Sequence, residues 1–379
     1  MDFNLSDEQK AFREVVRRFA DKELEPRAAE IDQTGAFPHD LRPKIAALNL
    51  YGILHPEAYG GVNAGYMAMT ISQIELARSC PAIAMHIQDQ SIVGYEINQY
   101  ASEKQKQDWL VPIIKGEKLG FFAFTEPATG SDPNMLETRA RSVEGGYVLN
   151  GVKRFITSGP IAQVGVVFAK DDSGDVSLFL VETDRPGFSA GQTYEKLGHR
   201  GATLSDIYMD NVSIPKENLL RDGNCFKELR SAMTLGKLCL SSQCVGIMQA
   251  ALDEAMRYAQ TRVQRGHPIW EFQHCHYLIT EIATLLEAAR LLTYQLAWQK
   301  DQGVDAIKQA SITKLFASQA AVMATKHALQ VHGSYGYLKE FKVERLFRDA
   351  RGYELFEGVS EVQREILASR LAKEYGIPG

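Results

Sequence analysis

The spacing of apolar residues changes twice along this 379-residue chain, and that change limits the folds it can adopt. Residues 1–118 place apolar side chains at the 3.6-residue period of amphipathic helices. Residues 119–225 carry short β-type runs divided by turn residues, and residues 226–379 return to long helical stretches. The pattern predicts an α+β fold with an N-terminal helical domain, a middle β domain and a C-terminal helical domain, divided at these limits.

The N-terminal zone begins with a helix-start signal. Ser6 followed by Gln9 fits a capping box, in which each side chain bonds the other residue's backbone N–H. Apolar residues at helical spacing follow directly, at Phe12, Val15, Val16 and Phe19. Further helices are expected over residues 41–50, 66–78, 83–100 and 103–115.

Two turn signals organise the β zone. Asn150-Gly151 lies between two apolar runs, and both residues accept the positive φ of a type I′ turn, which predicts a hairpin there. Asp171-Asp172-Ser173-Gly174 separates residues 164–169 from 176–181 and predicts a second hairpin. Because these strands follow one another without intervening helices, we expect an antiparallel β-barrel, or a sandwich, rather than a parallel sheet.

The C-terminal zone contains three long helical stretches. Residues 226–262 predict one long helix, or two with a bend, and residues 276–299 and 306–332 predict two more. Long helices that follow one another in sequence pack as an up-and-down bundle. We therefore expect a helical bundle after residue 226.

Composition excludes several classes of protein. The formal net charge is −5 and charges of both signs are spread along the chain, so nucleic-acid binding is not expected. No apolar run approaches the roughly 20 residues of a membrane-spanning helix. The five cysteines show no C-x-x-C spacing, which favours a reducing compartment and no metal site. The first residues lack a basic stretch before an apolar one, so we expect no secretory signal and a place in the bacterial cytoplasm or, after processing, the mitochondrial matrix.

Two motifs in the β zone could contact a planar cofactor. In residues 122–132, FAFTEPATGSD, a strand runs into a turn whose amides and hydroxyls could bond a carbonyl-bearing ring or an anion. An ordinary β-turn capped by Asp132 explains the same residues, and local chemistry alone favours it. In residues 154–159, RFITSG, Phe155 and Thr157 would share one face of a strand, where the ring could stack on a flavin. A plain strand end entering a turn is the alternative.

Two further motifs lie near the C-terminus. Glu357 follows apolar residues and precedes Gly358. A carboxylate in apolar surroundings has a raised pKa, which suits a general base near neutral pH, and the glycine permits close approach of a ligand. The alternative is a carboxylate in the first turn of the last helix, stabilised by the helix dipole. Residues 330–337, QVHGSYGY, predict a helix end with a glycine cap, and these glycines also permit dense contact with a cofactor.

Taken together and in this order, the motifs resemble those of the acyl-CoA dehydrogenase family over nearly the whole chain. The segments that carry the resemblance are FTEPATGSD, FITSG, RVQRG, QVHGSYGY, RLFRDA and FEGVSEVQR. The resemblance implies an N-terminal helical domain, a middle β-barrel domain and a C-terminal four-helix bundle, usually assembled as a homotetramer. It also implies FAD as the cofactor, an acyl-CoA as the substrate and an electron-transfer flavoprotein as the electron acceptor.

The resemblance also implies roles for single residues. Glu357 would remove the α-proton of the thioester while FAD accepts the β-hydride, giving an α,β-enoyl-CoA. Ser131, Lys237 and Gly358 would contact the substrate, with Lys237 in the place of a common Arg. Arg262 is similar to an Arg that holds the FAD of a neighbouring subunit. The implied cofactor contacts are Phe122, Phe124, Thr125, Ser131, Phe155, Thr157, Arg262, Gln273, Gln330, Gly333, Ser334, Val359 and Glu361.

The acyl group is left open by the sequence. Residues 84–91 line the acyl pocket in relatives, and His86 and Asp89 are unusual there because a fatty acyl tail needs apolar walls. In one interpretation both are satisfied as a polar pair or by solvent, and the substrate is a short or branched acyl-CoA. In the other, Asp89 acts as a second base, as in similar dehydrogenases of alicyclic carboxyl-CoA thioesters. Ile83 stands where glutaryl-CoA-binding relatives have an Arg, and Gly236 falls near a variant base position, so neither variant is expected.

Two other classes of function fit the same motifs. One is an acyl-CoA oxidase, in which oxygen re-oxidises the flavin. The other is a flavin-binding protein without turnover, and Glu357 argues against that class because it supplies a base.

Overall fold

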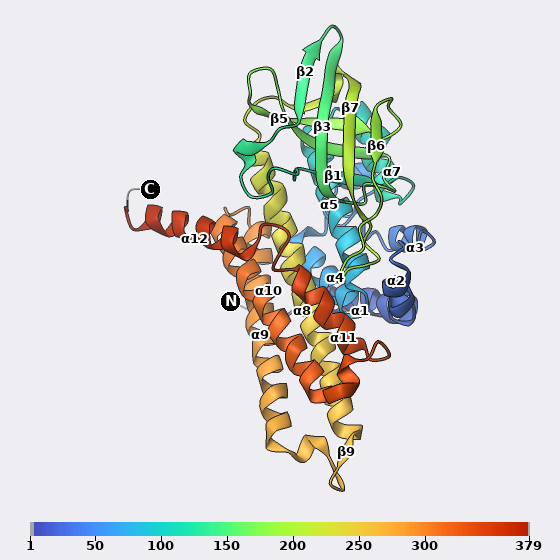
Figure 1. Cartoon of the computed structure of the whole chain (residues 1–379), viewed down its shortest axis with the longest axis vertical. Helices are drawn as coiled ribbons and strands as arrows, with labels where there is room; N and C mark the ends of the chain where they lie inside the picture. Colours follow the sequence, from blue (N-terminus) through green and yellow to red (C-terminus); the bar gives the residue numbers. More distant parts are fainter. Residues whose placement is uncertain (1–3, 378–379) are drawn as a thin grey trace.

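The computed structural model describes residues 4–377 and places helices at both ends of the chain on either side of a sheet (Figure 1). Helices extend to Ile114, strands follow between Gly120 and Arg221, and helices resume at Phe226. The predicted order of helical, β and helical regions is therefore confirmed. The domain limits at 118 and 225 stay a prediction.

The N-terminal region is built around two buried helices. The capping box predicted at Ser6 and Gln9 is present at the start of the first helix. Helices α4 and α5 are buried on nearly all sides, and their buried residues include polar side chains such as Gln73, Gln88 and Asp89 as well as apolar ones. The helices are α1 Asp7–Phe19, α2 Ala28–Thr34, α3 Leu41–Ala47, α4 Gly65–Ser79, α5 Pro81–Tyr100, α6 Glu103–Gln105 and α7 Val111–Ile114, with π-helical turns at Ala20–Leu24 and Lys106–Leu110.

The middle region is one eight-stranded sheet with the order β6-β7-β3-β2-β4-β5-β8, and β1 pairs with β4. Most neighbours are antiparallel, but β1–β4 and the single β2–β4 pair are parallel. The strand path does not close on itself within residues 4–377, so the predicted barrel is not confirmed. The strands are β1 Gly120–Ala123, β2 Arg139–Val143, β3 Gly146–Thr157, β4 Val164–Lys170, β5 Val176–Glu182, β6 Phe188–Ala190, β7 Leu204–Pro215 and β8 Leu219–Arg221.

The hairpin predicted at Asn150-Gly151 is wrong. Strand β3 runs through both residues, and the turn that joins β2 to β3 lies earlier, at Glu144-Gly145. Asn150 instead bonds β7 through its side chain, because its Oδ1 accepts from Asn211 N at 2.8 Å. The strand register shifts at this point, which makes the pair a β-bulge. The second predicted hairpin, between β4 and β5, is confirmed.

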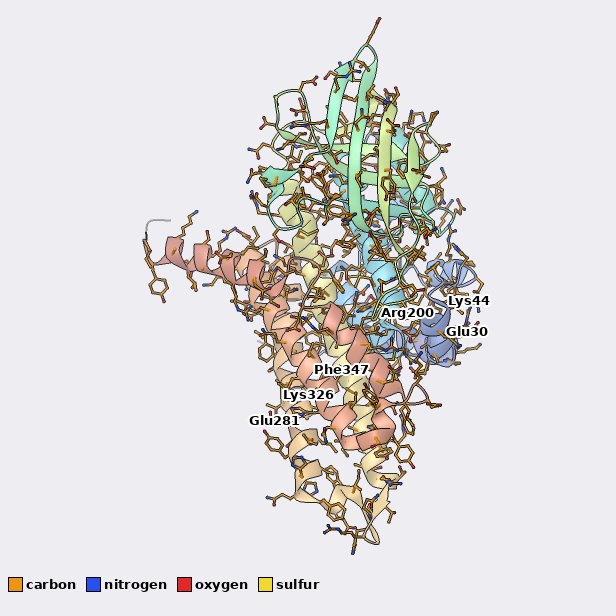
Figure 2. The ribbon with its side chains drawn as sticks, in the orientation of Figure 1. Glu30, Lys44, Arg200, Glu281, Lys326 and Phe347 are labelled. Carbon is orange, nitrogen blue, oxygen red and sulfur yellow. The ribbon has the colours of Figure 1, made fainter. Side chains whose placement is uncertain are left out.

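The C-terminal region is a bundle of long antiparallel helices. The predicted long helix is continuous over α8 Phe226–Thr261, whose 36 residues span about 54 Å. Phe347 of α11, Lys326 of α10 and Glu281 of α9 mark neighbouring helices of this bundle (Figure 2). The other helices are α9 Gln273–Asp301, α10 Ile307–His332, α11 Lys342–Gly352 and α12 Ser360–Glu374, with a small hairpin of β9 Val263–Gln264 and β10 His267–Pro268.

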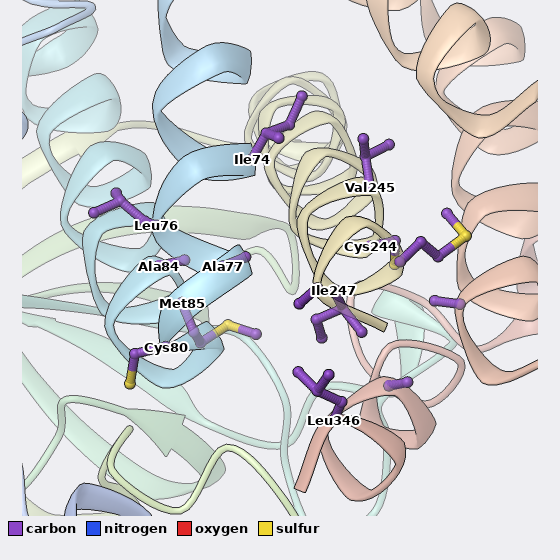
Figure 3. Close-up of a cluster of buried hydrophobic side chains, with 14 of the residues drawn as sticks. Ile74, Leu76, Ala77, Cys80, Ala84, Met85, Cys244, Val245, Ile247 and Leu346 are labelled. Carbon is purple, nitrogen blue, oxygen red and sulfur yellow. The ribbon is translucent and has the colours of Figure 1, made fainter. Parts of the chain in front are cut away.

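Helix α8 also packs against α4 and α5 and joins the two helical regions into one core (Figure 3). Ile74 and Leu76 of α4 and Met85 of α5 belong to the same buried cluster as Val245 of α8 and Leu346 of α11. Helix α12 extends away from this core (Figure 1). Across residues 4–377, we find no helix with both the length and the apolar character of a membrane span.

Replacing Gly151 by Ala tests the bulge. A Cβ at this position would overlap Thr138, so the variant combines backbone strain with overpacking. We expect Gly151→Ala to lower the free energy of unfolding by about 3 kcal/mol or more, measured by urea unfolding. Gly174→Ala is the matched control, because Gly174 also has a positive φ but has open space around it, and strain alone costs about 1–2 kcal/mol. Equal losses in the two variants would contradict the close contact of the bulge.

Candidate active site

Glu357 lies on the loop between α11 and α12, before the last helix begins. Its φ is 55° and Gly358 follows with a φ of 80°, so the chain makes a left-handed turn here. Helix α12 starts at Ser360, and the alternative that Glu357 lies in its first turn is therefore wrong. The turn is held by Gly358 O, which accepts from Lys314 Nζ at 2.7 Å and from Gln363 Nε2 at 2.9 Å.

The Glu357 carboxylate points into the protein interior. Its Oε1 accepts a hydrogen bond from Gln88 Nε2 at 2.8 Å, and its Oε2 is buried without a partner among the described residues. A Cβ atom at Gly236 would overlap the Glu357 carboxylate. Glycine at this position therefore leaves room for the carboxylate. Burial raises the pKa of Glu357 to about 7, while Lys237, the Gln88 hydrogen bond and Lys314 limit the rise. Such a group can take up a proton near neutral pH.

Two buried lysines face this carboxylate. Lys237 of α8 and Lys314 of α10 both interact electrostatically with Glu357, and burial lowers the pKa of each to about 8. Lys237 Nζ also approaches Ser311 Oγ at 3.4 Å. The structure thus brings Lys237 to the base, and its predicted contact with substrate stays a prediction. Lys314 was missed, because a lysine in a long helix usually lies on a solvated face.

Asp89 lies on α5, one residue after Gln88, and is buried. Burial raises the pKa of Asp89 well above its ordinary value, a hydrogen bond with Ser158 lowers it, and the charge of Glu357 raises it further. His86 belongs to a different environment, where it bonds Tyr51 Oη at 3.1 Å. The two residues are therefore not a polar pair: His86 is satisfied within the N-terminal core, and Asp89 faces Ser158 and Glu357.

The two β-zone motifs meet in the fold. Arg154 N donates to Thr125 O at 2.8 Å, which ties the turn after β1 to the end of β3. Behind this contact, Lys153 and Glu126 form a fully buried ion pair at 2.7 Å, and Lys153 Nζ also donates to Phe124 O. The carboxylate of Glu126 accepts further bonds from the backbone of Glu137 and Thr138. Because a buried pair of this kind needs all its partners, it fixes the position of the turn.

A large aromatic ring is presented at this junction. Phe155 has a φ of 59° and a 55% exposed side chain, next to Tyr194 at a ring distance of 5.5 Å. The register of β3 shifts between Lys153 and Ile156. Phe155 and Thr157 lie on either side of the buried Ile156 and are both at least partly exposed, and their sharing one face stays a prediction. Phe155 and Tyr194 together present exposed aromatic surface at this junction.

The residues at this junction fit a flavin ring. Thr125 and Thr157 are partly exposed and Ser131 is exposed, so hydroxyls accompany the Phe155 ring. Asp132 Oδ1 accepts from Asn134 N at 2.9 Å, as the ordinary turn interpretation expects, and contact of this turn with a cofactor stays a prediction. Phe122 and Phe124 pack edge-on against Phe168 and support the strand from inside.

Family comparisons identify the chain. It matches the models of the acyl-CoA dehydrogenase N-terminal domain over residues 6–117, the middle domain over 121–212 and the C-terminal domain over 225–372. The chain belongs to the acyl-CoA dehydrogenase family. The expected resemblance is confirmed over nearly its whole length.

Individual relatives cover almost the entire chain. A 3-(aryl)acrylate reductase of Clostridium sporogenes is 37% identical over 97% of this chain and 99% of its own. A subunit of the caffeyl-CoA reductase–Etf complex of Acetobacterium woodii is also 37% identical, over 97% and 99%. The structure of butyryl-CoA dehydrogenase from Megasphaera elsdenii superimposes with a TM-score of 0.94 at 33% identity, covering 98% and 100%.

Five of the remaining predicted cofactor residues lie at the far end of the bundle from the base. Arg262 lies 26 residues after Gly236, about 39 Å along α8, and its guanidinium stacks over Tyr335 at 5.3 Å. Figure 1 shows this end of the bundle, marked by β9, at the opposite end of the molecule from the sheet. The others in this group are Gln273, Gln330, Gly333 and Ser334, all exposed. Val359 is the N-cap of α12 and Glu361 lies exposed in its first turn, close to the base in sequence.

The buried state of Glu357 predicts a pH-dependent stability. Its pKa is raised from 4.5 to about 7 in the folded chain, so folding takes up a proton and stability falls as the pH rises between these values. We expect Glu357→Gln to stabilise the protein at pH 8 by up to about 3 kcal/mol and to have little effect at pH 4. Thermal melting across this range measures the difference.

The exposed Glu361 supplies the control. Glu361→Gln also removes a carboxylate close by, but from a solvated position. Its melting temperature should follow the wild type at every pH. A Glu357→Gln variant that behaves in the same way would show that the carboxylate is not desolvated.

Proposed function

We propose that this chain catalyses the FAD-dependent α,β-dehydrogenation of an acyl-CoA thioester, with Glu357 as the base that removes the α-proton. The observation that carries this proposal is the carboxylate of the partly buried Glu357, whose pKa is raised to about 7. Gln88 bonds its Oε1, and its Oε2 is buried without a partner among the described residues. Asp89 and Ser158 connect it to the end of β3, where Phe155 and Thr157 present the flavin-binding surface.

The residues of the chain account for the proton transfer. Lys237 and Lys314 favour the ionised form of Glu357, so the base is ready to accept a proton near neutral pH. The backbone N–H of Glu357 would bond the thioester carbonyl and stabilise the negative charge that develops when the α-proton leaves. Glu357 is partly buried and its Oε2 is out of contact with solvent, which limits the access of water to the base. FAD, when bound, supplies the acceptor for the β-hydride.

A short or branched acyl group fits the site best. The segment after Ile83 is buried, and its polar members Gln88 and Asp89 face the base instead of forming a long apolar channel. The relative of known structure from Megasphaera elsdenii is a butyryl-CoA dehydrogenase, which agrees with a short acyl chain.

A second candidate is a dehydrogenase of alicyclic carboxyl-CoA thioesters. It is favoured by one observation: Asp89 is buried, has a strongly raised pKa and interacts with Glu357, so two carboxyl groups adjoin one site. In this reading Asp89 would act as an additional base on a ring carbon that Glu357 does not reach.

The exposed group around Arg262 favours a homotetramer. Within one chain it lies at the far end of α8 from Glu357, so it would contact the FAD of a neighbouring copy. The Etf complex of the Acetobacterium woodii relative supports an electron-transfer flavoprotein as the partner. Bacterial relatives agree with a place in the bacterial cytoplasm, and the mitochondrial relatives agree with the matrix. We place the domain limits after residues 118 and 225, between the last helix or strand of one region and the next.

Anaerobic bleaching of the flavin tests the proposed reaction. The panel includes straight, branched, dicarboxylic and alicyclic acyl-CoAs, together with their α,β-unsaturated forms for the reverse direction. We expect bleaching by short or branched acyl-CoAs, and a loss of about 10³-fold or more in Glu357→Gln because the base is removed. Glu365→Gln, which changes an exposed carboxylate of α12 with no implied cofactor contact, should keep the wild-type rate.

The same panel separates the alternatives. Asp89→Asn should retain bleaching by short acyl-CoAs, and loss of bleaching by alicyclic thioesters alone would favour the second candidate. Rapid peroxide formation in air would indicate an oxidase, and no bleaching by any thioester would indicate a flavin-binding protein without turnover. Bleaching of Glu357→Gln at the native rate would contradict the assignment of the base.

Arg262→Ala tests the proposed sharing of FAD between copies. We expect the variant to lose most of its bound FAD, because a charge-assisted bond to the cofactor is removed at a distance from Glu357. The flavin-to-protein ratio of the purified tetramer measures this loss. Arg265→Ala is the control, since Arg265 is an exposed arginine of the same hairpin. A monomer that retains FAD fully would contradict the sharing.

A further inference from the structure

A chain of buried amides leads to the base. Gln73 of α4, Gln88 of α5 and Gln243 of α8 are each at most 1% exposed. Gln243 Nε2 donates to both Gln73 Oε1 and Gln88 Oε1 at 2.8 Å. Gln88 Nε2 then donates to Glu357 Oε1 at 2.8 Å. Three helices from separate parts of the sequence thus meet in one hydrogen-bond chain that ends on the catalytic carboxylate.

The direction of this chain is fixed from its far end. Tyr353 Oη, which is also fully buried, donates to Gln243 Oε1 at 3.0 Å. An amide whose oxygen accepts from a phenol must turn its NH₂ group the other way, so Gln243 donates to Gln88. Gln88 Oε1 is then occupied, and its NH₂ group must face Glu357. The carboxylate, which only accepts when ionised, is the matching partner at the other end.

We infer that the Tyr353–Gln243–Gln88 chain is a positioning device for Glu357, which aims its carboxylate and holds it in the ionised form. The inference rests on the proposed function of Glu357 as the base. Gln88 does not touch the reacting atoms in this role and is a positioning residue. Without the fixed direction of the amides, the Gln88 side chain could turn its oxygen to the base and favour the protonated acid instead.

Other charged groups around Glu357 do not provide this direction. Lys237 and Cys239 face it from α8, Lys314 from α10 and Asp89 from α5. The lysines attract the carboxylate and Asp89 repels it, but among the described residues only Gln88 donates a hydrogen bond to its oxygens. Loss of Gln88 would let the carboxylate move toward the lysines, away from its present orientation.

Three variants along the chain test the inference. Gln88→Met keeps the length of the side chain but removes the hydrogen-bond donor to Glu357. Gln243→Met removes the amide that bonds Gln88, and Tyr353→Phe removes the hydroxyl that bonds Gln243. We expect Gln88→Met to raise the apparent pKa of Glu357 by about one pH unit, which lowers the rate of flavin bleaching about tenfold at pH values below that pKa. The two distant variants should move the pKa in the same direction by less.

Two readouts keep this test independent of the proposed function. The pH profile of anaerobic flavin bleaching reports the base during turnover. The carboxyl C=O band in the infrared spectrum, assigned by its loss in Glu357→Gln, reports the same titration without any substrate. A shift of the infrared band without bleaching by any acyl-CoA would uphold the positioning role and overturn the proposed reaction.

Tyr51→Phe is the matched control. It removes a buried tyrosine hydroxyl that bonds His86, which lies on α5 like Gln88. This hydroxyl is not part of the amide chain. We expect a similar loss of thermal stability to Tyr353→Phe, with no shift of the titration. An unchanged titration in a folded Gln88→Met protein, or an equal shift in Tyr51→Phe, would overturn the inference.

Discussion

The contact of α8 with α4 and α5 is the interaction on which the rest of the structure depends. A Cβ at Gly246 of α8 would overlap the backbone of Ile74 on α4, so the two helices approach as closely as a missing side chain allows. This contact joins elements from the two ends of the sequence into one core. The base, its hydrogen-bond donor and the two lysines then come from four separate segments, and none of them forms the site alone.

A second contact fixes the loop that carries the base. His199, on the connection between β6 and β7, bonds Asp349 through its backbone N–H and its ring Nε2. The same ring packs edge-on against Tyr353 and Phe356, at 4.7 and 5.6 Å. The β region therefore holds the end of α11 from the side, and the turn at Glu357 is supported from both the sheet and the helices.

The sequence predicted the features that depend on local pattern. Helical spacing, the capping box at Ser6 and the hairpin at Asp171–Gly174 require only neighbouring residues, and all three are present. Glu357 was found because its motif is ordered with others along the chain. The bulge at Asn150 was mistaken for a hairpin, since the same Asn-Gly pair suits both and the choice depends on Asn211, sixty-one residues away.

Other features could not be predicted from local pattern. Gln88, Gln243 and Lys314 occupy helices whose buried sides are known only once their neighbours are in place. A glutamine or lysine in such a helix has the same local appearance on a solvated face as in the interior. Their roles depend on contacts between distant segments, and for that reason the surroundings of the base emerged only from the fold.

The buried amides have a consequence for the evolution of this core. Apolar side chains of similar volume at Gln73, Gln88 and Gln243, combined with loss of the Tyr353 hydroxyl and the Glu357 carboxylate that they bond, would form a dry interior. Replacing a complete buried polar network in this way is often neutral or stabilising. Selection for heat resistance alone would therefore favour their loss. If all three glutamines are retained under such selection, they are retained for turnover and not for stability. These positions therefore distinguish selection for stability from selection for catalysis.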